Sequence, residues 1–165
     1  MASCTDFTVR QLEPNDVALM EAVMTVFGEA FNEVDTYTGA RPSTRYLERL
    51  LGGSHLIALA ALKDSVVVGG LLAYELQKVE RERSEIYIYD LAVVEAHRRR
   101  GIATALIEEL KSLAAERNTY VIFVQADLRD AAAIALYTGL GTRAEVLHFD
   151  IGIGAPTDRN VITQS

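Results

Sequence analysis

One segment near the middle of the chain limits the folds that the chain can adopt. Residues 85–94 (EIYIYDLAVV) are rich in β-branched and aromatic side chains, which predicts a strand. Arg98-Arg99-Arg100-Gly101 follows almost at once, and an amphipathic pattern then predicts a helix over residues 102–117. A strand that passes through a tight turn into a helix is typical of proteins in which helices pack on a sheet.

Further strands and helices are expected on both sides of this segment. The hairpin of strands 55–62 and 66–76 excludes a purely parallel sheet. The order therefore predicts an α/β (α+β) fold with a mixed, mostly antiparallel central sheet flanked by helices. The other expected elements are a strand over 7–12, a helix from Pro14, a short helix over 43–51 capped by Ser43, an apolar central strand over 120–126, a helix over 130–139 and a last strand over 145–153.

Length and composition set the domain organisation that we expect. The chain has 165 residues, of which 50% are hydrophobic, and this predicts a single domain over residues 1–154 with a disordered tail over 155–165. The N-terminal residues lack the pattern of a signal peptide, and no apolar run reaches the roughly 18 residues of a membrane helix, so a cytoplasmic protein without membrane partners is expected.

Charged and metal-binding side chains exclude several function classes. The net charge of −7 disfavours a nucleic-acid partner and favours a cationic small molecule. Cys4 is the only cysteine, and the three histidines show no ligand spacing, so neither a disulfide nor a metal site is expected.

The three arginines precede a helix N-terminus, where the unpaired N–H groups and the helix dipole already disfavour cations. An anion at this turn would explain the arrangement, because Gly101 allows close backbone approach and the first amides of the helix can hold phosphate oxygens. The pattern is neither a Walker loop nor a dinucleotide fingerprint. The alternative is an exposed basic turn, with or without salt bridges.

The same residues resemble a known family. Leu91-Ala92-Val93 followed by Arg98-x-x-Gly101-x-Ala103 resembles the core motif of the GNAT acetyltransferase superfamily. Within it, the runs SEIYIYDLAV, RRRGIATALI, YVIFVQAD, ALYTGLG and HFDI closely resemble the gentamicin-type aminoglycoside 3-N-acetyltransferases. The resemblance implies the GNAT acyl-CoA N-acyltransferase fold, acetyl-CoA as co-substrate, no metal, a cationic aminoglycoside as acceptor and a possible homodimer.

The resemblance also implies which residues bind acetyl-CoA. The strand residues of the motif would pair with the pantetheine arm, and the turn and first helical residues would wrap the pyrophosphate. The usual asparagine of the downstream motif is missing, and Asp130 lies near its place. The expected contacts are Leu91, Ala92, Val93, Arg98, Arg99, Arg100, Gly101, Ile102, Ala103 and Thr104, with Asp130 and Ala133 on the adenine side.

Two side chains are the candidates for proton transfer. Asp90 is a carboxylate inside an apolar strand, which fits a base or an anchor for the substrate ammonium; the alternative is a salt-bridged or edge-exposed aspartate. The resemblance makes Tyr137 the acid for the CoA sulfur, and the alternative is a core aromatic residue. Backbone N–H groups of residues 91–93 would stabilise the carbonyl oxygen.

Four further residues are expected to bind the acceptor. Glu33, Asp35 and Asp150 would extend an acidic pocket, although each also fits a solvated surface position, and Tyr89 would line the cleft or simply pack. Cys4 lies near the terminus with no histidine close in sequence, so direct transfer in a ternary complex is expected rather than an acetyl-enzyme.

The leading interpretation is acetylation of the 3-amino group of the 2-deoxystreptamine ring of an aminoglycoside, giving resistance. Acetylation of a polyamine or a peptide amine on the same scaffold is a second interpretation. A CoA-binding module without turnover is a third, and it predicts binding without release of free thiol.

Overall fold

The computed structural model describes residues 6–154, which divide between Asp127 and Leu128 into two compact units. The first unit contains a five-stranded sheet and its helices, and the second contains one helix of the described chain. The single domain expected over residues 1–154 stays a prediction. Cys4 and the tail expected over 155–165 lie outside the described residues.

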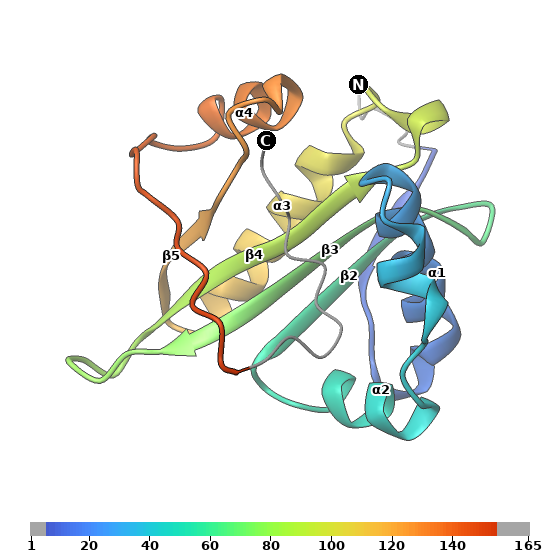
Figure 1. Cartoon of the computed structure of the whole chain (residues 1–165), viewed down its shortest axis with the longest axis horizontal. Coiled ribbons are helices and arrows are strands. Elements are labelled where there is room, and N and C mark those ends of the chain that lie inside the picture. Colours follow the sequence, from blue (N-terminus) through green and yellow to red (C-terminus); the bar gives the residue numbers. More distant parts are fainter. Residues whose placement is uncertain (1–5, 155–165) are drawn as a thin grey trace. The chain divides into compact units, whose positions relative to one another are not determined.

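The sheet of the first unit is mixed, as the sequence predicts. Its strands lie in the order β1-β2-β3-β4-β5, with antiparallel pairing from β1 to β4 and parallel pairing between β4 and β5 (Figure 1). The last two strands are joined by a helical crossover, which parallel neighbours require. The strands are β1 (Thr8–Gln11), β2 (Leu56–Lys63), β3 (Val66–Gln77), β4 (Ser84–Val93) and β5 (Thr119–Val124).

Helices cover both faces of this sheet (Figure 1). Val23 and Phe27 of α1 (Val17–Ala30) and Leu47 of α2 (Thr44–Leu51) share one core cluster with Ala58 and other residues of β2. The intervening residues of β2 point to the opposite face. There α3 (Ile102–Glu116) contacts β2, β3, β4 and β5 and buries its apolar stripe.

Local signals place the helix starts and the hairpin where the sequence predicts them. A 3₁₀ turn at Pro14–Asp16 leads into α1, and the Ser43 hydroxyl accepts a hydrogen bond from the Tyr46 N–H at 3.3 Å to cap α2. Asp64 and Ser65 both have positive φ angles (49° and 66°), which suits the two-residue turn between β2 and β3.

A β-bulge in β4 determines which way Asp90 points. Leu72 of β3 pairs with Asp90 but the next residue, Ala73, pairs with Ile88, so Tyr89 is an extra residue. In a regular strand Asp90 would lie on the same face as Ile88, which is 3% exposed in the core. The bulge reverses this alternation, and Asp90 reaches the face covered by α1.

Two sequence expectations about strands are wrong. The expected central strand, β5, is the end strand of the sheet within residues 6–154, and Tyr120, Val121 and Phe123 are at least 36% exposed. The expected last strand over 145–153 has no regular structure. An apolar pattern indicates that a segment would bury side chains in a sheet, but the backbone partner that decides its position comes from elsewhere in the chain.

Candidate active site

Asp90 is bound by a tyrosine that comes from a loop far away in sequence. The Tyr37 hydroxyl donates a hydrogen bond to Asp90 Oδ1 at 3.1 Å. Tyr37 lies in a π-helical turn, η2 (Asp35–Gly39), and its ring is 5.9 Å from the rings of Phe27 and Phe31. The aromatic contacts fix the ring, so the hydroxyl presents a defined donor to the carboxylate.

Gly28 allows this turn to lie against α1. A Cβ at Gly28 would be 3.2 Å from Val34 Cα and 3.3 Å from Tyr37 Cβ, closer than ordinary contacts. Any side chain at this position would push the turn away from the helix. Gly28 therefore helps to place the Tyr37 hydroxyl beside Asp90.

The surroundings of Asp90 favour a carboxyl group that titrates near neutrality. Burial raises the pKa of Asp90 from 3.8 to about 6, the Tyr37 hydrogen bond opposes this increase, and the charge of Glu33 adds to it. Burial, followed by the Asp90 charge, raises the pKa of Tyr37 well above its usual value of 10, so its hydroxyl remains a donor. The raised pKa makes Asp90 more basic than an ordinary aspartate, which suits a general base.

The two parallel strands stop pairing next to Asp90. The last pair between them is Ile88 with Val124, whereas β4 continues to Val93. Leu91, Ala92 and Val93 therefore lie beyond the end of the β4–β5 ladder. β5 does not pair with this edge of β4, which fits the pantetheine contacts expected from the sequence.

The turn after β4 leaves the first amides of α3 without helical partners. Arg99 and Gly101 adopt left-handed conformations (φ 62° and 80°), and a Cβ at Gly101 would meet no atom within 4 Å. The first helical hydrogen bond runs from the Ala105 N–H to Gly101 O at 2.9 Å. The N–H groups of Ile102, Ala103 and Thr104 come before it and have no acceptor within the helix. Open space beside Gly101 and amides that precede the helical ladder together fit a diphosphate.

The arginines of the turn differ in their surroundings. Arg98 Nε donates to Val93 O at 3.1 Å and so ties the turn to the end of β4. Arg99 and Arg100 are exposed, and among residues 6–154 neither forms an ion pair within 4 Å. The alternative of an exposed basic turn therefore stays open, without salt bridges from these two arginines within the described residues.

The second unit holds the remaining predicted cofactor and acid residues. Asp130 caps α4 (Ala131–Thr138), and its Oδ1 accepts a hydrogen bond from the Ala133 N–H at 2.9 Å. Asp130 and Ala133, the two residues expected on the adenine side, are therefore joined by a hydrogen bond. Burial, with a contribution from the Asp130 charge, raises the pKa of Tyr137 to about 12, so its hydroxyl is protonated at neutral pH.

The four expected acceptor-binding residues fall into two groups. In the first unit, Tyr89 is 59% exposed, and Glu33 lies close enough to raise the pKa of Asp90, whereas Asp35 is exposed at the start of η2. In the second unit, the Asp150 side chain is 95% exposed and bonds to His148 at 3.1 Å. The structure therefore brings Asp90 together with Tyr89 and Glu33.

Sequence reasoning missed Tyr37 and Gly28. Both lie more than 50 residues before Asp90, and the hydrogen bond spans 53 positions. The one available signal is a tyrosine within a polar loop that already carries Glu33 and Asp35. Only the packing of α1 against the sheet turns that signal into a contact.

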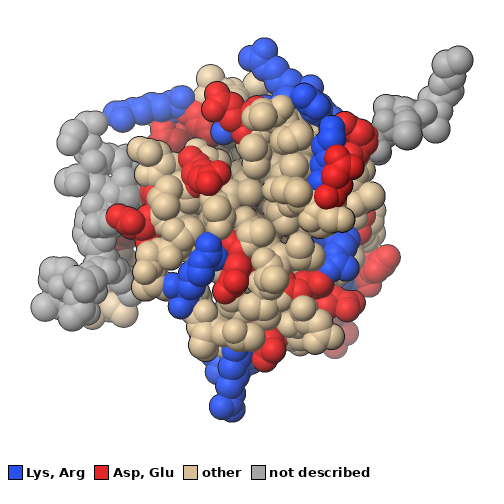
Figure 2. All heavy atoms as spheres, turned by 90° about the vertical axis from the view of Figure 1, so that its right-hand side faces the viewer, with Lys and Arg blue, Asp and Glu red and all other residues tan. Residues whose placement is uncertain are grey.

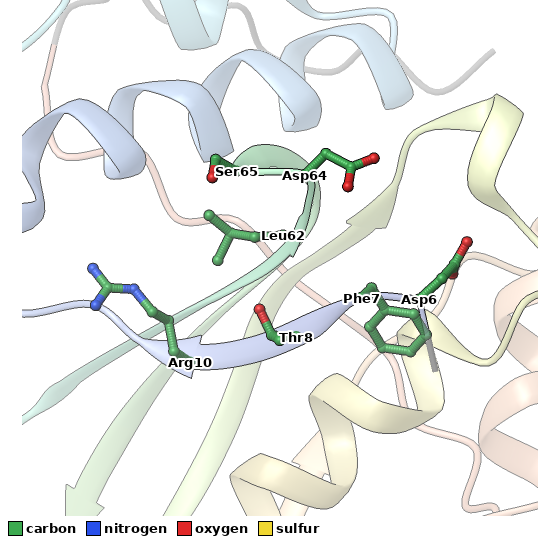
Figure 3. A pocket seen from close by; sticks show the side chains of 7 residues that line it. All are labelled: Asp6, Phe7, Thr8, Arg10, Leu62, Asp64 and Ser65. Carbon is green, nitrogen blue, oxygen red and sulfur yellow. The ribbon is translucent and has the colours of Figure 1, made fainter. Parts of the chain in front are cut away.

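A cavity and the charge pattern of one face lie apart from the Asp90 site. A surface cavity of about 370 Å³ is lined by β1 and the two residues before it, by Leu62 of β2 and by the β2–β3 turn (Figure 3). Its Asp6 and Arg10 are paired with Lys63 and Asp16, and two strands separate β1 from β4. On the face in Figure 2, acidic and basic side chains are interspersed, so the net charge of −7 is not gathered into one acidic patch there.

Among residues 6–154, no group of three or more histidine, cysteine, aspartate or glutamate side chains could hold a metal ion. Within the same residues, every helix is too short or too polar to span a membrane.

Comparison with known protein families identifies a match over most of the chain. Residues 18–142 match the profile of the acetyltransferase (GNAT) family. No curated protein matches the chain.

Several solved structures are similar to the chain. An aminoglycoside acetyltransferase from an uncultured soil metagenomic sample is 63% identical, with 90% of this chain and 99% of that chain covered and a TM-score of 0.88. A second aminoglycoside acetyltransferase from such a sample, in complex with sisomicin, is 27% identical. The match covers 90% of this chain and 97% of that chain, with a TM-score of 0.83. The aminoglycoside N-acetyltransferase AAC(6')-Iy in complex with CoA is 15% identical, with 92% of this chain and 98% of that chain covered and a TM-score of 0.72. At this identity the match shows a similar fold and nothing more.

Proposed function

The chain belongs to the acetyltransferase (GNAT) family, and from that premise we propose that it transfers acetyl from acetyl-CoA to an aminoglycoside. The acceptor is the 3-amino group of the 2-deoxystreptamine ring, and acetylation of this amine confers resistance. The 63% identity to an aminoglycoside acetyltransferase supports the acceptor class. The runs SEIYIYDLAV and HFDI, which resemble the 3-N-acetyltransferases, support the position on the ring.

The observation that carries the proposal is the half-buried Asp90 at the β4 bulge. It is held by Tyr37, and it lies where the pairing of β4 with β5 ends. A carboxylate here accepts a proton from the acceptor ammonium, directly or through water, and so produces the neutral amine that attack requires. The same negative charge attracts a polycationic substrate.

The transfer step follows from the proposed placement of acetyl-CoA. The neutral amine attacks the thioester carbonyl carbon, a C–N bond forms, and the C–S bond breaks. A backbone N–H of residues 91–93 donates to the carbonyl oxygen. The ammonium protons pass to Asp90 and solvent, and Tyr137 donates a proton to the departing thiolate.

The residues that bind acetyl-CoA are assigned in the same way. The amides from Arg99 to Thr104 hold the pyrophosphate, with Arg98 and Arg100 beside them, and Leu91 to Val93 pair with the pantetheine arm. Asp130 and Ala133 lie on the adenine side. Glu33, Asp35, Tyr89 and Asp150 contact the acceptor. No residue is acetylated, because transfer is direct within a ternary complex.

The test measures free thiol with acetyl-CoA and a panel of amines. The panel contains gentamicin, an aminoglycoside with a hydroxyl in place of the 6'-amine, spermidine and a lysine peptide. We expect release with both aminoglycosides, and NMR of the product should place the acetyl group on the 3-amine. Acetylation at another amine would reject the 3-position while keeping the enzyme class.

Two other outcomes would favour the competing functions. Faster release with spermidine or with the peptide would make a polyamine or a peptide amine the acceptor. Binding of acetyl-CoA without release for any amine would indicate a non-catalytic module. Each outcome contradicts the proposed reaction in a different way.

A further inference from the structure

Four aromatic side chains form a row on the sheet face that Asp90 shares. The strand register places Tyr74 of β3 opposite Tyr87 of β4, and Tyr87 beside Phe123 of β5. The bulged Tyr89 joins them. We call these four residues the aromatic row.

Ring contacts connect the row without a break. The Tyr87 and Phe123 rings stack with centroids 4.9 Å apart and planes inclined by 11°. The Tyr89 ring meets Tyr74 at 5.7 Å and Tyr87 at 5.8 Å, both edge to face. The row therefore spans three strands as one surface.

The exposure of the row is unusual for a group of core residues. Tyr89 is 59% exposed and Phe123 is 36% exposed, and the other two rings are half-buried. On the opposite face of the same β4 strand, Ile86 and Ile88 are 0% and 3% exposed. The sequence thus places aliphatic residues where β4 faces the core and large rings where it is open, which is a distribution suited to a ligand.

Negative charge adjoins the row. Asp90 directly follows Tyr89, and burial together with the nearby Tyr89 and Asp90 raises the pKa of both Tyr74 and Tyr87. Aromatic faces attract cations through the ring quadrupole, and a carboxylate beside them adds to this attraction. The chain already uses tyrosines in this way, because Arg83 lies 3.8 Å over the ring of Tyr120.

We propose that the aromatic row binds an ammonium-bearing sugar ring of the acceptor other than the ring that is acetylated. This inference rests on the proposed function and narrows the acceptor class to amino sugars with at least two charged rings. Asp90 receives the reacting amine, and the rings of the row hold a second ammonium and the apolar face of its sugar. A linear polyamine has no such sugar face to lay on the rings.

The test compares Tyr89→Leu with Tyr89→Phe, because Tyr89 is the most exposed ring and its replacement leaves the core intact. Tyr89→Leu should raise the KM for a multiply aminated aminoglycoside about fivefold, with kcat and the KM for acetyl-CoA within about twofold of wild type. Tyr89→Phe keeps the ring and should recover most of the acceptor affinity that Tyr89→Leu loses. Tyr120→Leu is the matched control, since Arg83 already covers that ring.

A second acceptor isolates the contribution of charge. An aminoglycoside with hydroxyls in place of the amines on the rings outside 2-deoxystreptamine should lose little affinity in Tyr89→Leu. An equal loss for both acceptors, or no loss for either, would overturn the proposal. Calorimetric titration without acetyl-CoA measures the same affinities, so the row is tested even if wild-type protein releases no thiol and the proposed function fails.

Discussion

Two aspartates occupy similar sequence patterns but very different surroundings. Asp90 in IYIYDLAV and Asp150 in HFDI are each a carboxylate within an apolar run. Asp90 lies in β4, is half-buried and accepts a hydrogen bond from Tyr37. Asp150 lies in a segment without regular structure, and its side chain is 95% exposed.

The difference shows what decides the chemistry of a carboxylate. Burial raises the pKa of Asp90 to about 6, although the Tyr37 hydrogen bond opposes this increase. Water screens an exposed carboxylate, which then acts on a substrate only as a surface charge. The proposed function therefore uses Asp90 for proton transfer and Asp150 for attraction, and the following experiments test that division.

The largest effect is expected for Asp90→Asn. The amide keeps the shape of the side chain but accepts no proton, so kcat/KM for the aminoglycoside should fall about 10²–10⁴-fold. Steady-state thiol release measures this loss, and the KM for acetyl-CoA should stay near wild type. Activity within about threefold of wild type would remove Asp90 from proton transfer and end the contrast with Asp150.

Gly101→Val tests whether the cofactor site is separate from both aspartates. A β-branched residue strains a backbone with φ of 80°, so the amides of the turn should shift and the KM for acetyl-CoA should rise at least about tenfold. The aminoglycoside KM should change little. Gly152→Val is the control, because a Cβ there meets no atom within 4 Å and its φ is not positive. An unchanged acetyl-CoA affinity would argue against a diphosphate at this turn.

Much of the first unit follows from the sequence. The hairpin, the cap at Ser43 and the strand–turn–helix around Gly101 rest on contacts within a few residues, and the structure places them as predicted. Asp90 was also recognisable, because a carboxylate in an apolar strand needs an explanation.

The features that complete the site depend on distant contacts. The bulge at Tyr89 arises from register against β3, and the Tyr37 hydrogen bond needs α1 to pack on the sheet. The edge position of β5 and the irregular 145–153 segment are likewise matters of which backbone finds a partner. Periodicity contains no information on that choice.

Tyr37→Phe sharpens the account of Asp90. Loss of one hydrogen bond to a charged group should lower kcat/KM for the aminoglycoside about tenfold. The hydrogen bond favours the ionised carboxylate, so its removal raises the pKa of Asp90. If ionised Asp90 is the active form, kcat/KM of the wild type increases with pH around the Asp90 pKa of about 6. This acidic limb of the pH profile should lie at higher pH in the variant.

The control for this variant is Tyr120→Phe, which removes a hydroxyl bonded to Glu85 at 2.9 Å on the same sheet. Its pH profile of kcat/KM should match wild type. A lower rate in Tyr37→Phe with an unmoved acidic limb would mean that the Tyr37 hydroxyl acts without changing the ionisation of Asp90. The ratio of variant to wild-type profiles cancels the ionisation of the substrate amine itself.

Asp150→Asn should give the smallest effect and tests the other side of the comparison. An exposed carboxylate attracts a polycation through water, so its loss should raise the aminoglycoside KM about two- to threefold at low salt and leave kcat unchanged. At about 0.5 M salt the difference from wild type should disappear, because screening weakens surface charges first. An effect above tenfold that persists in salt would mean that Asp150 loses its water when the substrate binds. Asp150 would then resemble Asp90 in the complex, and exposure in the free protein would no longer separate the two carboxylates.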